Sequence, residues 1–381
     1  MRICHLISSI GKGGAETHLY SLVKKQIQNK NSIIIIYLKG NDFWKKYYNK
    51  IGVKTYKLSL LSIFNLFRLI EVYFKIKNIC STFKPDIIHS HLLAMELIGA
   101  ILKYNLTNKF KLVVTKHLDS FFLEASFGRT NFIKGVFIDR FIISQSNKVI
   151  CISKQVKKYF LLNIPEYKKK YIVIYYGFPF EEFKFFKNKY KFQKKLKQKY
   201  KINNNDLILC NVARHVRQKS LDILLKGFSE YVVLNNNSRL ILVGKGPETQ
   251  KLKKLSIDLK INNKIIWINN YNNISDIFEL SDIFILTSQY EGLGLVLLES
   301  MASKIPIIAS KISAIPEVVI NNFNGYLFSY GNYNIIPKKI LKLENKYKRK
   351  IFGQNGYQLL KKKFNLNEMH SKTMQVYNKI I

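Results

Sequence analysis

Residues 288–302 read SQYEGLGLVLLESMA and follow directly on the apolar run Ile283–Thr287. That run has the length and composition of a buried strand, and the apolar residues after Gly294 continue into a segment with the length of a helix. Two glycines at the junction, Gly292 and Gly294, let the backbone turn sharply and come close to a ligand. Residues 283–302 therefore predict a strand, a tight turn and a helix, the unit from which parallel α/β sheets are built.

The same junction has the features of a phosphate-binding site. Free N–H groups at a helix start attract phosphate oxygens, and we expect four residues to lie against the ligand there: Gly292, Leu293, Gly294 and Leu295. Glu299, about two turns into the helix, can accept two hydrogen bonds from a vicinal diol such as a ribose. Glu291 lies at the mouth of the turn. Two solvated charges are the alternative, but the apolar residues around Glu299 indicate a buried carboxylate, which needs a partner.

Apolar, β-rich runs alternate with segments of helical period along nearly the whole chain, which is typical of parallel sheets joined by helices. The expected strands of the first half are Ile3–Ser8, Ser32–Leu38, Ile87–Ser90, Leu112–Thr115, Lys148–Ile152 and Tyr171–Tyr175. Those of the second half are Leu207–Ala213, Arg239–Val243, Ile265–Ile268, Ile283–Thr287 and Ile307–Ser310. We expect an α/β protein with Rossmann-like domains at residues 1–177 and 178–364, and a helix over 365–381 that packs back on the first.

The spacing of Glu291 and Glu299 resembles the E-x7-E motif of the retaining GT-B glycosyltransferases of family 4, also called glycosyl transferases group 1. The resemblance continues in PIIA at 306–309, NVARHVRQKSLD at 211–222, LVGKGPE at 242–248 and GKGGAE at 11–16. It covers nearly the whole chain and is strongest in the second half. It implies the GT-B fold, with two Rossmann-like domains whose parallel sheets face a central cleft.

The family pattern assigns donor-binding roles to two cations and two glycines. Arg214 and Lys219 match its Arg and Lys, which neutralise the departing diphosphate as a metal would otherwise do. Gly244 follows the strand ending at residue 243, and Gly14 lies within the GKGGAE segment after the first strand; both are expected near the donor. Ser220 replaces the usual glycine after the lysine, which puts the local turn geometry in question.

Histidines follow several expected strands of the first half. His117 resembles the histidine with which the family faces the donor sugar across the cleft, and we expect it to act in catalysis together with Glu291, Arg214 and Lys219. His89 and His91 could form a metal pair, but no third ligand is evident, so packing and hydrogen bonding are favoured. Tyr176 stands where the family usually has Asn, which affects the acceptor side. The residue that contacts the base is not assigned.

The expected reaction needs no cofactor and no metal. The sequence contains no Asp-x-Asp motif of the kind that holds a divalent ion in GT-A transferases. The donor is a nucleotide sugar, a UDP-sugar rather than a GDP-sugar, and the family implies retention by attack from the front face. One alternative is a GT-B sugar-nucleotide epimerase, which eliminates the nucleotide without transfer. The other is a non-enzymatic, basic protein that binds nucleic acid, although no base-reading motif is present.

The charge points to an anionic surface. Against 63 Lys and Arg the chain has 24 Asp and Glu, a formal net charge of +39. Lysines alternate with aromatic residues between Lys184 and Lys201, and no apolar run is long enough to span a bilayer. Four separate cysteines fit a reducing cytoplasm. We therefore expect a cytoplasmic enzyme on the inner face of an anionic membrane, acting on a lipid-linked glycan, lipopolysaccharide or related polysaccharide acceptor, with no nucleic-acid partner.

Overall fold

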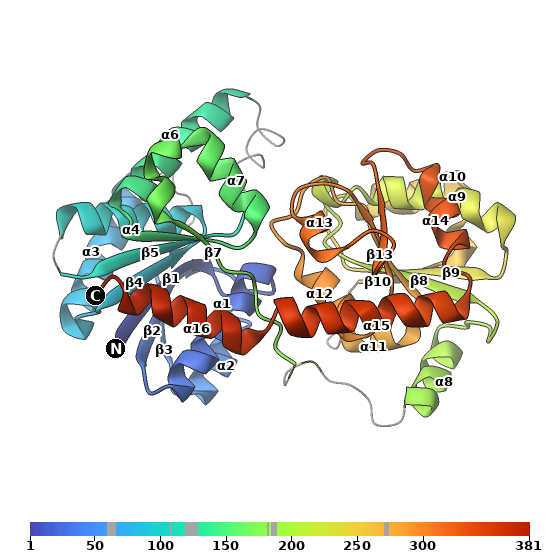
Figure 1. Cartoon of the computed structure of the whole chain (residues 1–381), viewed down its shortest axis with the longest axis horizontal. Helices are drawn as coiled ribbons and strands as arrows, with labels where there is room; N and C mark the ends of the chain where they lie inside the picture. Colours follow the sequence, from blue (N-terminus) through green and yellow to red (C-terminus); the bar gives the residue numbers. More distant parts are fainter. Residues whose placement is uncertain (59–65, 107–108, 119–128, 181–182, 184–188, 270–273) are drawn as a thin grey trace. The chain divides into compact units, whose positions relative to one another are not determined.

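The computed structural model describes residues 1–58, 66–106, 109–118, 129–180, 183, 189–269 and 274–381. The chain forms two compact units (Figure 1). The first joins Met1–Gly177 with Asn365–Ile381, and the second is Phe178–Phe364. Each unit has one parallel sheet with helices around it. The predicted α/β class with two parallel sheets is confirmed.

The sheet of the first unit has seven strands in the order β3-β2-β1-β4-β5-β6-β7, all paired in parallel. The strands are β1 Arg2–Ser9, β2 Ser32–Lys39, β3 Lys54–Lys57, β4 Ile87–His91, β5 Lys111–Lys116, β6 Lys148–Cys151 and β7 Tyr171–Val173. Strand order reverses between β1 and β4. In open parallel sheets, ligands bind beyond the carboxyl ends of the strands at such a reversal.

Helices cover both faces of this sheet, since side chains of a strand point alternately to its two faces. They are α1 Gly14–Gln28, α2 Lys45–Lys50, α3 Leu66–Phe83, α4 Leu93–Asn105, α6 Arg129–Gln145, α7 Lys154–Asn163, the 3-10 helix η1 Pro165–Lys170 and α16 Leu366–Asn378. Ile3 and Ile7 of β1 belong to the core with α1 and α16. Cys4 and Leu6 belong to the core with α3 and α4 on the other face.

The second unit has a six-stranded sheet in the order β10-β9-β8-β11-β12-β13, also parallel. Its strands are β8 Leu207–Val212, β9 Ser238–Val243, β10 Ile265–Ile268, β11 Ile283–Leu286, β12 Ile307–Ser310 and β13 Gly325–Phe328. Its helices are α8 Lys189–Lys199, η2 Arg217–Lys219, α9 Leu221–Leu234, α10 Thr249–Asp258, η3 Asn262–Lys264, α11 Ile274–Leu280, α12 Leu295–Ala302, α13 Ile315–Val318, α14 Ile335–Leu341 and α15 Lys346–Lys363. Here the order reverses between β8 and β11.

The last helix, α16, completes the first unit after the chain has built the second. Met369, Val376 and Tyr377 are buried in the core that β1 and α1 form. The side chain of Asn365 caps α16 by accepting hydrogen bonds from two backbone N–H groups. Both termini therefore lie in the same unit (Figure 1).

In the described ranges, no helix combines the length and apolar character needed to cross a membrane. All four cysteines, Cys4, Cys80, Cys151 and Cys210, are buried and unpaired.

Candidate active site

The candidate site of the second unit lies where the strand order reverses. β8 and β11 are neighbours in the sheet, and the loops that leave their carboxyl ends carry the predicted residues. The loop after β8 contains Arg214 and Lys219, and the loop after β11 contains Glu291 and Gly294. Two segments about 70 residues apart in the sequence thus meet beyond the carboxyl ends of the strands, where ligands usually bind in such sheets.

Lys219 and Glu291 form an ion pair beyond the carboxyl ends of β8 and β11. The Nζ atom of Lys219 is 2.5 Å from Oε1 of Glu291, and the two side chains are only 14% and 9% exposed. The hydroxyl of Ser288 donates a second hydrogen bond, of 2.7 Å, to the same oxygen. The sequence assigned Lys219 to the diphosphate and Glu291 to the sugar; the structure brings them into direct contact. Each side chain therefore fixes the position of the other.

Backbone contacts tie the two loops together. The side-chain amide of Gln218 donates to the carbonyl of Tyr290 at 2.9 Å, and the N–H of Gln289 donates to the carbonyl of Gln218 at 2.8 Å. The Thr287 hydroxyl is shared between the carbonyls of residues 219 and 220. No role was assigned from the sequence to Gln218, Thr287 or Ser288. A hydroxyl three residues before Glu291 was a signal for Ser288, but nothing local marks Gln218, whose partners are distant in sequence.

Ser220 adopts the backbone conformation for which the family uses glycine. Its φ and ψ are 45° and 49°, in the left-handed region that side chains other than glycine rarely occupy. The Ser220 hydroxyl lies 3.2 Å from the carbonyl of Arg217 and 3.0 Å from the hydroxyl of Tyr330. These contacts offset part of the cost of the conformation. The turn geometry that the substitution put in question is therefore present.

Glu299 is the carboxylate that the turn leaves without a protein partner. Gly294 has a φ of +83° and α12 begins at the next residue, so Glu299 is the fifth residue of the helix, about one turn in rather than two. No side chain caps this helix start. Glu299 is half-buried, and within the described ranges no hydrogen bond to its side chain is found. Burial raises the pKa of Glu299 to about 7, as expected for a carboxylate that lacks donors.

Gly244 brings the loop after β9 against the loop after β8. Its φ is +138°, and a Cβ atom there would lie 1.9 Å from the carbonyl oxygen of Ala213. Only glycine permits that approach. Arg214, which follows Ala213, is exposed, so its guanidinium can reach a ligand. Gly244 acts on the site through the backbone that carries Arg214.

Two of the predicted site residues, Gly14 and His117, belong to the first unit. Gly14 is exposed and is the first residue of α1, whose preceding residue, Gly13, makes no side-chain cap. His117 follows β5 and is buried. Its Nδ1 is 2.5 Å from the hydroxyl of Tyr176 and its Nε2 is 3.1 Å from Nδ1 of His91. Both ring nitrogens of His117 are therefore engaged inside the unit.

Burial also controls the protonation of His117. It lowers the pKa of His117 well below its usual value, and the nearby His18 and Lys116 lower it further. The ring is therefore neutral at physiological pH. Tyr176, which stands where the family usually has Asn, thus contacts His117 directly.

The histidines of β4 do have a third partner. His5 of β1 lies beside His89 and His91, and one nitrogen of each ring lies within 4.8 Å of the others. The sequence did not reveal His5 as a neighbour of this pair, because the contact depends on the register between β1 and β4, which places His5 opposite His89.

Comparisons with known proteins identify the family. Residues 192–359 match the model of glycosyl transferases group 1, and residues 12–182 match the model of glycosyltransferase family 4. This chain is a group 1/family 4 glycosyltransferase.

Relatives of this glycosyltransferase span most of its length. It is 28% identical over 387 residues to an uncharacterised glycosyltransferase of Methanocaldococcus jannaschii, covering 97% of this chain and 95% of the relative. It is 25% identical to the N-acetyl-alpha-D-glucosaminyl L-malate synthase of Bacillus anthracis, with coverage of 88% and 84%. It is 23% identical to the UDP-Gal:alpha-D-GlcNAc-diphosphoundecaprenol alpha-1,3-galactosyltransferase of Escherichia coli, with coverage of 77% and 75%.

The solved structures show the fold of the glycosyltransferase. Anabaena HepE, in complex with UDP and glucose, superposes with a TM-score of 0.84 at 20% identity, covering all of both chains. The predicted GT-B fold is thereby confirmed.

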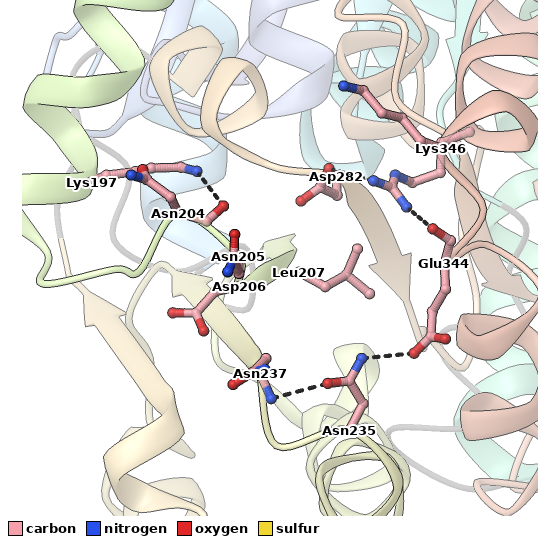
Figure 2. A pocket seen from close by; sticks show the side chains of 11 residues that line it. Lys197, Asn204, Asn205, Asp206, Leu207, Asn235, Asn237, Asp282, Glu344 and Lys346 are labelled. Atoms are coloured by element: carbon pink, nitrogen blue, oxygen red, sulfur yellow. Dashed lines mark hydrogen bonds and ion pairs between the residues drawn. The ribbon is translucent and has the colours of Figure 1, made fainter.

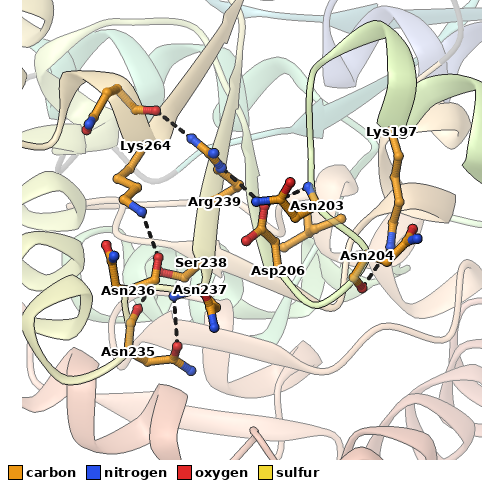
Figure 3. Close-up of polar contacts among 12 residues, drawn as sticks. Lys197, Asn203, Asn204, Asp206, Asn235, Asn236, Asn237, Ser238, Arg239 and Lys264 are labelled. Carbon is orange, nitrogen blue, oxygen red and sulfur yellow. Dashed lines mark hydrogen bonds and ion pairs between the residues drawn. The ribbon is translucent and has the colours of Figure 1, made fainter.

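A pocket of about 400 Å³ lies at the opposite end of the strands of the second sheet, where their amino ends are (Figure 2). Its lining includes Asp206, Leu207 and Asp282, which precede or begin strands. Figure 3 shows how this edge is held together: Arg239 pairs with Asp206 at 3.2 Å, and Lys264 donates to the carbonyl of Asn236. These contacts join loops at the amino ends of strands, so the pocket is separate from the candidate active site.

Proposed function

We propose that this glycosyltransferase moves a sugar from a nucleotide diphosphate to a lipid-linked glycan, a lipopolysaccharide or a related cell-surface polysaccharide. The transfer retains the anomeric configuration and needs no catalytic metal. The donor is a UDP-sugar, which the UDP and glucose of the structural neighbour HepE support. The acceptor class is supported by the Escherichia coli relative, which acts on a sugar linked to diphosphoundecaprenol.

The observation that carries the donor site is the unpartnered Glu299 carboxylate beyond the Gly294 turn. A ribose diol supplies the two hydrogen bonds that Glu299 lacks in the protein. The uncapped start of α12 then faces the diphosphate, since free N–H groups at a helix start attract phosphate oxygens. Arg214 adds an exposed cation on the same edge of the sheet. Glu299 is thus the anchor from which the rest of the donor is positioned.

Lys219 and Glu291 act as one unit on the reacting end of the donor. Oε1 of Glu291 holds Lys219 and Ser288, which leaves Oε2 for a sugar hydroxyl. The Lys219 ammonium stabilises the diphosphate as negative charge grows on it. The bond between the sugar C1 and the phosphate oxygen breaks, a bond from C1 to the acceptor oxygen forms on the same face, and the departing phosphate oxygen takes the acceptor proton.

Thermal unfolding in the presence of UDP, GDP and ADP tests the donor site. A ligand at a hundred times its Kd stabilises the folded state by about 2.7 kcal/mol, which for a unit of this size raises Tm by roughly 5–10 °C. We expect the largest shift with UDP, with or without EDTA. Glu299→Gln loses the shift, whereas the control Glu230→Gln, an exposed glutamate on α9, keeps it. An undiminished shift in folded Glu299→Gln would refute the proposed site.

Turnover with a UDP-sugar and a lipid-linked acceptor tests the reaction itself. Lys219→Ala should abolish transfer in a folded protein, and Lys254→Ala, an exposed lysine on α10, should not. Activity that depends strictly on added Mg²⁺ or Mn²⁺ would overturn the metal-independent mechanism. Nucleotide release without transfer, in the absence of any acceptor, would favour the epimerase alternative.

A further inference from the structure

A continuous chain of buried polar side chains crosses the first unit. It begins at Gln26 on α1, passes through His5 of β1 and His91 of β4, and ends at His117 and Tyr176. The successive distances are 2.8 Å, 3.3 Å, 3.1 Å and 2.5 Å. The five side chains are at most 7% exposed. Water therefore does not compete for these hydrogen bonds.

The three rings of this chain are neutral. Burial lowers the pKa of His5 to about 4, and it lowers the pKa values of His91 and His117 well below their usual value. A neutral imidazole has one N–H donor and one bare acceptor nitrogen. Each ring must therefore donate at one end and accept at the other, and the direction of any one hydrogen bond fixes all the others.

Gln26 sets that direction. Its Nε2 points to the hydroxyl of Tyr377 at 3.5 Å, so its Oε1 faces Nε2 of His5. An amide oxygen only accepts, so His5 carries its proton on Nε2 and its Nδ1 is bare.

The remaining bonds follow in order. His91 donates from Nε2 to His5 and accepts at Nδ1 from Nε2–H of His117. Tyr176 donates to Nδ1 of His117.

A side branch agrees with the same assignment. The Tyr377 hydroxyl, which accepts from Gln26, is 2.6 Å from Nδ1 of His89 and can donate to it. Nε2–H of His89 then donates to the hydroxyl of Thr115 at 2.6 Å. The three hydrogen bonds of the branch can therefore form with the same proton positions as those of the chain. Tyr377 of α16 therefore holds the Gln26 amide in the orientation that the chain requires.

A divalent ion among His5, His89 and His91 is the competing arrangement, because their nitrogens converge. All six ring nitrogens already have hydrogen-bond partners. In the described part of the chain, no carboxylate contributes to the shifted pKa of these rings. A buried double charge without an anion is costly. The geometry favours hydrogen bonds over a metal.

We propose that Gln26 and Tyr377 are positioning residues that set the tautomer of His117 through His5 and His91. His117 then carries its proton on Nε2 and accepts at Nδ1 from Tyr176. With the Gln26 amide reversed, every bond in the chain would reverse and Tyr176 would have to accept instead. The tautomer is a property of the first unit alone and does not rest on the proposed function.

Nitrogen NMR of the full chain, labelled with ¹⁵N-histidine, reads the tautomers directly. The protein has seven histidines, and single His→Asn variants assign them. We expect His5, His91 and His117 to show the neutral Nε2–H pattern at pH 7. Gln26→Leu should abolish the single Nε2–H pattern of His91 and His117, neither of which Gln26 touches. Gln28→Leu, an exposed glutamine on the same helix, should change neither.

Two tyrosine variants cover the case in which Gln26→Leu fails to fold. Tyr377→Phe removes the oxygen that orients the Gln26 amide and that also contacts His89, so His117 should again populate both tautomers. Tyr48→Phe removes a buried hydroxyl that has no hydrogen-bond partner and should leave His117 unchanged. A wild-type Nδ1–H pattern at His117, tautomers unaffected by Tyr377→Phe, or stoichiometric metal in the purified protein would overturn the proposal. The UDP-induced thermal shift, which reports the second unit, tests the proposed function separately.

Discussion

Glu299 keeps its carboxylate half-buried without a donor, and this has a cost for the free protein. Its pKa is about 7, against an ordinary value of 4.5. Between these values the folded state holds a proton that the unfolded state has released, so stability falls as pH rises through this window. This loss of folding stability levels off above pH 7 at no more than about 3 kcal/mol, and solvent around the half-buried carboxylate makes it smaller. In the proposed donor complex, a bound ribose would remove that cost by supplying hydrogen bonds.

Glu299→Gln should therefore stabilise the empty protein while it weakens donor binding. The glutamine has no charge to desolvate, so the stability gain over wild type should be small at pH 5 and largest near pH 8. Urea unfolding at both pH values measures it, with Glu230→Gln as the control. Donor affinity of the wild type should rise between pH 6 and pH 8, because the ionised carboxylate is the better acceptor. A gain that is the same at pH 5 and pH 8 would contradict the burial argument.

Single residues of the site were predictable where local chemistry marked them. Glu291 and Glu299 stood out by their spacing around a glycine turn, and Gly294 does adopt a positive φ. The ion pair between Lys219 and Glu291 could not be predicted, because it depends on two loops meeting beyond neighbouring strands. The partners of His117 were hidden for the same reason, since they come from β4 and from the segment after β7.

At the level of elements, the missed strands share one property. The strands absent from the sequence prediction are β3 and β13, and both lie at an edge of their sheet. β3 reads KTYK and has no buried residue, and β13 reads GYLF. Central strands, buried on both faces, are near-continuous apolar runs and were predicted. Edge position alone does not decide the signal, because the other two edge strands, β7 and β10, lie in the apolar runs YIVIY and IIWI and were predicted. β3 is polar, and the apolar part of β13 is only three residues long.

The close approach of two loops at Gly244 leads to a prediction about the site. Gly244→Ala places a Cβ atom 1.9 Å from the carbonyl of Ala213, so the loop that carries Arg214 has to move. We expect a loss of about 2–4 kcal/mol in stability, and a reduced UDP-induced thermal shift. Urea unfolding and the nucleotide panel measure the two effects.

Gly331→Ala is the matched control for Gly244→Ala. Gly331 also has a positive φ, +87°, but nothing lies within 4 Å of its added Cβ. Its cost should be only about 1 kcal/mol of backbone strain, with nucleotide binding intact. Equal effects of the two substitutions would show that backbone conformation, and not the contact with Ala213, decides the outcome.

For the whole molecule, removing α16 should damage one unit and spare the other. A chain ending at Phe364 loses the buried side chains of Met369, Val376 and Tyr377 from the core of the first unit. Their burial is worth on the order of 5 kcal/mol, comparable to the total stability of a domain. We expect the first unit to unfold or to be digested by protease, while the second keeps its UDP-induced shift. Removal of Ile381 alone, which is exposed, should change neither. An intact, cooperative first unit in the shortened chain would contradict this.

The net charge of +39 leads to a prediction about membranes. Residues 184–188 of the lysine-rich stretch lie outside the described part of the chain, but Lys194, Lys195 and Lys199 of α8 are exposed. Each lysine near an anionic leaflet contributes about 1 kcal/mol, so changing all three to Gln should reduce vesicle binding roughly 100-fold. Co-sedimentation with anionic vesicles at low salt measures this, and binding should fall as salt rises.

The control for the membrane prediction removes the same charge elsewhere. Lys251, Lys254 and Lys260 are also exposed, on or just after α10. Changing them to Gln should leave most of the vesicle binding intact if the α8 side contacts the lipid. Equal losses in the two triple variants would indicate a general attraction by net charge, and recovery of the wild type in the supernatant with anionic vesicles would refute membrane association.

The return of α16 to the first unit also sets the order of events during synthesis. The ribosome makes residues 1–177 first, yet Tyr377 and its neighbours are added only after residues 178–364. At about 5–20 residues per second, the nascent first unit waits some tens of seconds for its last helix. During that time its apolar groove beside α1 is open to chaperones, and the second unit, encoded in one continuous segment, can finish folding first.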